Sequence, residues 1–112
     1  MKKISTVSHA DLPTSSERSV LSALLRSGAV ARSEVTSLTN LSQQSVHRIV
    51  DTLERRKFLK LRDPETRGRG KPSPNVTIDT QHYSSIGISI GTEEIRVCAM
   101  DLAGQPIAED TL

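Results

Sequence analysis

The spacing of apolar residues changes at Phe58, and this change limits the folds open to the chain. Before Phe58, apolar residues recur every three or four positions, which is typical of helices with one buried face. After it they alternate with polar residues, which is typical of strands. The aromatic content is 2%, so the core must be aliphatic. The sequence therefore predicts an α+β fold with an aliphatic core.

The first helix is predicted over 15–27, after a polar leader, residues 1–14, that we expect to be flexible. Thr14 and Glu17 have the spacing of a capping box at its start, and Gly28 is suited to its end. One face of this helix is expected to be buried and to contain Val20, Leu21, Leu24 and Leu25.

Two further helices follow, separated by a tight turn. The short one, in "SEVTSLTN", has Val35 and Leu38 one turn apart and stops at Asn40, which tolerates the left-handed conformation of a turn. The longer one has Ser42 as its N-cap and continues for about four turns. Its buried stripe is predicted to contain Val46, Ile49, Val50, Leu53 and the stem of Lys57. These three helices are the parts of a helix-turn-helix.

The strands after the helices fall into two groups. "FLKLR" at 58–62 and "NVTID" at 75–79 flank a loop rich in Gly and Pro, so they predict a β-hairpin that forms the wing of a winged helix-turn-helix over 15–80. Three more strands in a meander are predicted from Tyr83 onward, with turns at 91–93 and 103–104. Nothing in the chain covers their apolar face, so 81–112 are interpreted as the truncated, three-stranded start of another domain.

The outward face of the longer helix carries polar side chains suited to DNA. With the apolar stripe buried, a rotation of about 100° per residue places Gln44, Arg48, Asp51 and Arg55 on the opposite side, flanked by Ser45 and His47. In a major groove, Gln can pair with adenine and Arg with guanine, while a helix N-terminus suits a phosphate. The alternative is a face that is merely solvated.

Basic residues are concentrated around these elements. Residues 1–78 hold 14 Lys and Arg against 7 Asp and Glu, whereas 79–112 hold Arg96 against six acidic residues. Eight basic residues lie between Arg55 and Lys71. This asymmetry predicts a surface for a polyanion. Double-stranded DNA is the favoured partner, because the chain has too few aromatic residues for the base stacking that single-stranded RNA requires.

The segment "RGRGKPSPN", residues 67–75, is either a wing tip or a flexible linker. Gly68 and Gly70 leave no side chain between the cations, so the loop could enter a minor groove with Arg69 and Lys71 at its floor. A phosphate-binding loop is excluded because Glu65 stands at the position of its first Gly and Pro72 follows the Lys. The candidate DNA-binding residues are Ser42, Gln43, Gln44, Ser45, His47, Arg48, Arg55, Lys60, Arg67, Arg69 and Lys71.

Other classes of protein are not supported. Cys98 is the single Cys, expected to be a buried small hydrophobe, and the three His are too far apart in the sequence for metal-ligand spacing. No apolar run could span a membrane and no signal peptide is present, so a cytoplasmic protein without a membrane partner is expected. No catalytic constellation is found, so neither an enzyme nor a cofactor is expected.

In order and motifs, residues 16–112 resemble the start of the ROK family (repressor, open reading frame, kinase) of transcriptional repressors, such as the xylose and N-acetylglucosamine repressors. The resemblance rests on "TNLS" at 39–42, "VHRIV" at 46–50 and "GRGKP" at 68–72. It implies a winged helix-turn-helix that binds operator DNA as a homodimer or higher oligomer. It also implies a following actin/sugar-kinase-like α/β domain, of which only the start is present here. A sugar effector is expected only with the missing C-terminal domain.

The chain departs from that family pattern at two places. The Ser or Thr that usually caps the second helix is Ala31, so either Ser33 caps a shortened helix or the cap is lost, at a cost of about 1 kcal/mol. The kinase pattern G-I-D-I-G-G-T appears as "GISIGT" at 87–92, with Ser89 in the acidic position. This argues against a sugar kinase with an N-terminal extension. A winged helix that binds only proteins is a further alternative. The favoured prediction is a sequence-specific repressor of carbohydrate-utilisation genes.

Overall fold

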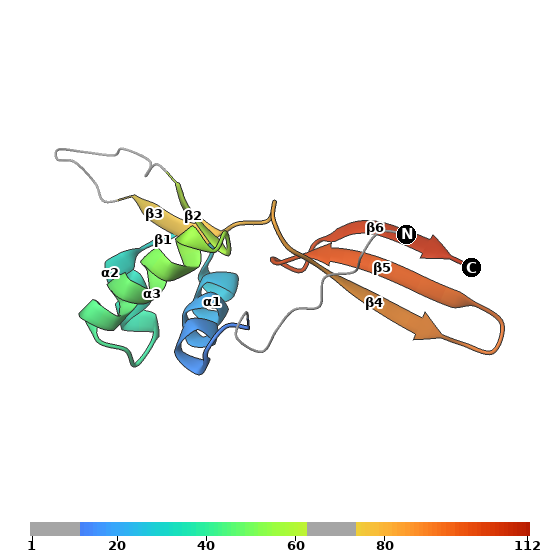
Figure 1. Ribbon diagram of the computed structural model, residues 1–112, viewed down its shortest axis with the longest axis horizontal. Helices are drawn as coiled ribbons and strands as arrows, with labels where there is room; N and C mark the ends of the chain where they lie inside the picture. The colour runs from blue at the N-terminus through green and yellow to red at the C-terminus, as the bar shows by residue number, and fades with distance from the viewer. Residues whose placement is uncertain (1–11, 63–73) are drawn as a thin grey trace.

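The computed structural model describes residues 12–62 and 74–112. Helices and a small sheet form one end of an elongated molecule and a second sheet forms the other (Figure 1), with overall extents of 59 × 32 × 28 Å. The elements are α1 Ser15–Ser27, β1 Val30–Ala31, α2 Arg32–Leu38, α3 Gln43–Arg55, β2 Leu59–Arg62, β3 Asn75–Ile78, β4 Ser84–Ile90, β5 Ile95–Asp101 and β6 Pro106–Thr111. The predicted α+β fold is confirmed.

Helix α1 has the predicted bounds. The Thr14 hydroxyl accepts a hydrogen bond from the backbone N–H of Glu17 at 3.2 Å and donates to its carboxylate at 3.2 Å. Gly28 ends the helix with a φ of 74°, which a residue without Cβ adopts freely. The prediction that Leu25 is buried is wrong, because it is 51% exposed and Ala23 faces the core instead.

Helix α2 begins without a side-chain cap. Ala31 occupies the N-cap position and forms no capping hydrogen bond, and Ser33 lies inside the helix, so the cap is lost rather than moved. Val35, one turn before the end of the helix, is fully buried. Leu38, the last residue of the helix, lines a hollow together with Arg18 and is 47% exposed.

Helix α3 confirms the predicted N-cap and apolar stripe. The Ser42 hydroxyl accepts from the backbone N–H of Ser45 at 3.2 Å. The buried residues of the helix are Val46, Ile49, Val50 and Leu53. The prediction for Lys57 is wrong, because α3 ends at Arg55 and Lys57, with a φ of 67°, turns the chain out of the helix and is exposed.

The wing is a three-stranded antiparallel sheet in the order β1-β3-β2. The predicted hairpin of β2 and β3 is present, with Leu59 opposite Ile78 and Arg62 opposite Asn75. Strand β1 was not predicted, because two residues are too few to show alternation. The sheet closes a single core with the helices, and this core is aliphatic except for Phe58: Val20, Leu24, Val30, Val35, Val46, Ile49, Val50, Leu53, Phe58, Leu59, Val76 and Ile78.

The second sheet is the predicted meander, in the order β4-β5-β6. Ile86, Ile88 and Ile90 are 69%, 63% and 78% exposed, so no described residue covers this face. In the register, Ile88 lies opposite Val97 and Cys98 opposite Gly87. The prediction that Cys98 is buried is wrong: it is half-buried, because this sheet is a single layer.

Aromatic and charged contacts join the second sheet to the end of α3. The Tyr83 ring stacks on the Phe58 ring, with centroids 4.4 Å apart, and its hydroxyl donates to the backbone oxygen of Arg56 at 2.7 Å. The Arg56 guanidinium lies 5.1 Å from the Phe58 centroid and donates to the carboxylate of Glu17 on α1 at 3.2 Å. Leu102 also packs against the core.

Buried Asp79 fixes the segment between the two sheets. Its carboxylate accepts from the backbone N–H of Gln81 at 2.9 Å and lies 2.9 Å from Nδ1 of His82. The Gln81 hydrogen bond, with a smaller contribution from His82, lowers the pKa of Asp79 below its ordinary value despite the opposing effect of burial.

Candidate DNA-binding surface

The first two turns of α3 present a polar surface to solvent. Burial of the apolar stripe leaves Gln43, Gln44, His47 and Arg48 exposed on the rest of the helix. The side chains of Gln44 and Arg48 form no hydrogen bond or ion pair within 12–62 and 74–112. They can therefore contact DNA without breaking an internal interaction.

The hydroxyls at the start of α3 are partly used within the protein. Besides capping the helix, the Ser42 hydroxyl donates to the hydroxyl oxygen of Ser45 at 3.0 Å. The Ser45 hydroxyl keeps its own proton for an outside acceptor. Of these two candidate residues, Ser45 is thus the better placed to donate to a phosphate oxygen.

Arg32, the first residue of α2, connects α2 to α3. Its Nη1 lies 3.2 Å from Nδ1 of His47, and its Nη2 lies 2.8 Å from Oδ1 of Asp51 and 4.0 Å from Oε2 of Glu54. Sequence reasoning missed Arg32, because no local spacing marks a contact between residues fifteen positions apart. Because Arg32 forms an ion pair with Asp51, the Asp51 carboxylate does not face DNA as an uncompensated negative charge.

A hollow of about 420 Å³ lies between the start of α2, the start of α3 and the base of the wing. Gln43, His47 and Arg32 line it together with Leu61 of β2 and Pro74 before β3. The structure therefore brings two of the predicted DNA-binding side chains, Gln43 and His47, next to the wing.

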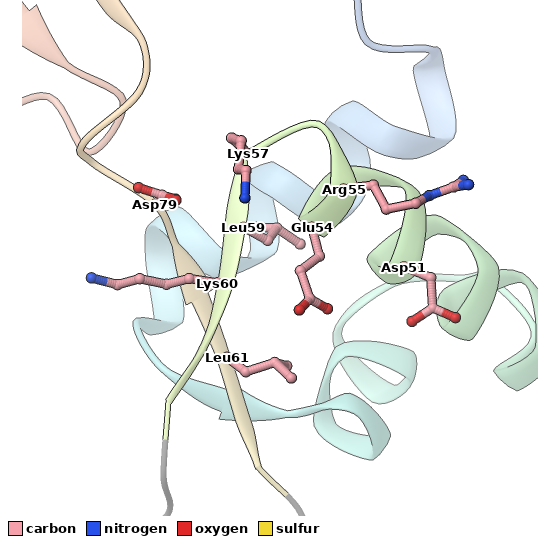
Figure 2. Close-up of a pocket in the computed structure, with 8 residues that line it drawn as sticks. All are labelled: Asp51, Glu54, Arg55, Lys57, Leu59, Lys60, Leu61 and Asp79. Carbon is pink, nitrogen blue, oxygen red and sulfur yellow. The ribbon is translucent and has the colours of Figure 1, made fainter.

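The remaining candidates are less closely grouped. Arg55 lies at the far end of α3, near a groove of about 560 Å³ between this helix and β2. Lys60 extends from the side of β2 opposite to Leu59 and Leu61, away from Asp51 and Arg55 (Figure 2). Arg67, Arg69 and Lys71 lie outside the described residues. Arg55 and Lys60 thus line the same groove, although the Lys60 side chain extends away from Arg55.

These elements define the class of the protein: a winged helix-turn-helix domain, with an exposed polar helix beside a β-wing, of the DNA-binding kind found in transcription regulators. The chain belongs to the MarR family, whose sequence model matches residues 10–70. The comparison with curated proteins found no match.

One solved structure, described as the ROK family transcriptional regulator that is a homolog of the E. coli MLC protein, has the same fold. It superposes with a TM-score of 0.67 at 14% identity, over 87% of this chain and 25% of that one. The chain therefore spans about a quarter of the length of that protein. At this identity the likeness concerns the fold alone.

None of the helices in the described part of the chain is long and apolar enough to cross a membrane. Within residues 12–62 and 74–112, no three His, Cys, Asp or Glu side chains are grouped as metal ligands would be.

Proposed function

We propose that this chain is the operator-binding part of a cytoplasmic transcriptional repressor of carbohydrate-utilisation genes. In this proposal α3 enters the major groove with its N-terminal turns foremost, and the loop at 67–72 enters an adjacent minor groove. The partner is double-stranded DNA, bound by a homodimer or higher oligomer of the complete protein. The MarR match and the likeness to a ROK regulator support a DNA-binding regulator.

The observation that carries the proposal is the state of the first two turns of α3. The apolar stripe of α3 is buried in the core, so only the polar faces of the helix remain for a ligand. Gln44 and Arg48 remain exposed and unpaired among the described residues, and these are the residue types that form bidentate pairs with adenine and guanine.

The second sheet is proposed to be the start of an effector-sensing, sugar-kinase-like domain. Its uncovered face of Ile86, Ile88 and Ile90 supports this, because a single-layer sheet must bury its apolar face against another element. A sugar effector would then bind only when the remainder of such a domain is present.

The proposal is tested by selecting bound duplexes from a random-sequence pool and titrating the best one with salt. About half of the eight basic residues between Arg55 and Lys71 would contact phosphates of one half-site. The logarithm of the binding constant should then fall with the logarithm of the salt concentration with a slope of roughly −3 to −5. Failure to enrich any sequence, or binding that does not respond to salt, would favour a winged helix that binds proteins.

A further inference from the structure

We propose that Arg32 is a positioning residue for DNA recognition, which orients His47 so that its Nδ1 accepts from Arg32 and its Nε2–H faces an acceptor on the DNA. The inference rests on the proposed function. It adds a residue from α2, outside the helix that reads the DNA, and it assigns a defined chemical role to His47.

The donor chemistry of arginine determines which nitrogen of His47 carries the proton. A guanidinium has N–H donors and no acceptor. Its Nη1 lies 3.2 Å from Nδ1 of His47, so Nδ1 must accept this hydrogen bond. A neutral imidazole that accepts at Nδ1 carries its proton on Nε2. Nε2 has no hydrogen-bond partner among the residues that the structure describes, so its proton is available to a ligand.

Arg32 is itself held in place from the other side. Its Nη2 donates to Asp51 at 2.8 Å, and its side chain is 24% exposed. His47 and Asp51 are four residues apart, so they lie on one face of α3 and receive the two nitrogens of one planar guanidinium. Because both nitrogens are used within the protein, Arg32 serves better to orient His47 than to bind a phosphate. A lysine has no planar fork and would not hold both partners in this geometry.

The place of His47 suits a contact with DNA. It lines the hollow between the helices and the base of the wing, next to Gln43. A duplex held by α3 and the wing would close this hollow. The Nε2–H would then meet an acceptor, which is either a phosphate oxygen or the edge of a base, such as guanine O6 or thymine O4.

Binding by Arg32→Ala, His47→Ala and the double variant tests the proposal. The probes are the best duplex selected from a random pool and a scrambled duplex of the same composition. Arg32→Ala should weaken binding to the selected duplex about tenfold, but only about twofold when residue 47 is already alanine. Equal losses in the two backgrounds would overturn the proposal, because Arg32 would then act without His47. Dependence on His47 for the selected duplex alone indicates a base contact, and for both duplexes a phosphate contact.

Two matched substitutions separate geometry from charge. Arg26→Ala removes the same charge from exposed α1 surface and should weaken both duplexes about twofold or less. Arg32→Lys keeps the charge and loses the fork, so it should weaken the selected duplex nearly as much as Arg32→Ala. Full binding by Arg32→Lys would show that charge alone is needed, which contradicts the proposal.

The nitrogen of His47 that carries the proton can be identified in the 112-residue chain without DNA, by long-range ¹H–¹⁵N spectra. The wild-type ring should show a single Nε2–H form, and Arg32→Ala should show a mixture of both neutral forms. A proton on Nδ1 in the wild type would refute the inference. If the wild type bound no duplex, the proposed function would fail, while these spectra would still decide how Arg32 and His47 interact.

Discussion

Replacing Gln44 or Arg48 with alanine should separate base reading from general attraction to DNA. Neither side chain has a partner among the described residues, so each can contribute the full free energy of a bidentate base contact. Such a contact contributes about 1–3 kcal/mol of discrimination, which corresponds to a loss of roughly 5- to 150-fold in affinity. The two residues are four positions apart, about 6 Å along the helix axis. If α3 lies along the groove, this is nearly two base-pair steps, so each substitution should relax the preference at a different base position.

Fluorescence anisotropy with the selected duplex and its single-base-pair variants measures this effect. Lys60→Ala is the control, because Lys60 extends from the opposite side of β2 and should attract all sequences alike. If the three substitutions weakened binding to selected and scrambled duplexes by one common factor, α3 would not be the reading element.

Three further predictions concern the core, the acid range and the loop. Leu53→Ala should lower the free energy of unfolding by about 2–5 kcal/mol in urea titrations, because Leu53 is fully buried. Leu25→Ala should lower it by less than about 0.5 kcal/mol, because Leu25 is 51% exposed, and equal losses would contradict the packing of α1 on α3. Because the folded protein lowers the pKa of Asp79, its ionised form stabilises the fold above the unfolded pKa of about 3.9, and this contribution is lost as pH falls through the folded pKa. Asp79→Asn should therefore lower the free energy of unfolding at neutral pH and flatten its dependence on acid pH. An unchanged pH profile would show that Asp79 contributes nothing. If the loop at 67–72 enters a minor groove, Arg69→Ala and Gly70→Val should both weaken binding to A·T-flanked sites and hardly affect G·C-flanked ones, whereas in a linker Gly70→Val would be harmless.

The parts of the fold that the sequence predicted well depend on interactions between near neighbours. The cap at Ser42, the cap at Thr14 and the stripe of α3 each involve residues within about one turn of each other, so their spacing is visible in the sequence. The errors concern how far the core extends. Leu25 has the correct helical spacing, but the core does not reach it.

The parts that could not be predicted depend on contacts between distant segments. The two-residue β1 exists because β3 pairs with it, not because of any pattern of its own. The contact from Arg32 to His47 and Asp51 requires α2 to lie across α3 at one particular angle, which helical periodicity does not specify. The candidate residues on α3 could be chosen from local periodicity, whereas the residue that orients one of them could not.

The elongated arrangement of the two sheets affects how the size of this protein should be measured. Its radius of gyration is 17.3 Å, whereas a compact chain of this length would have about 13 Å. An elongated monomer diffuses more slowly than a compact protein of equal mass, so it leaves a gel-filtration column early, at a volume typical of a heavier globular protein. Elution volume alone would therefore overestimate the mass of the monomer. Light scattering, which reports mass independently of shape, is the appropriate measurement for any study of how this chain assembles on DNA.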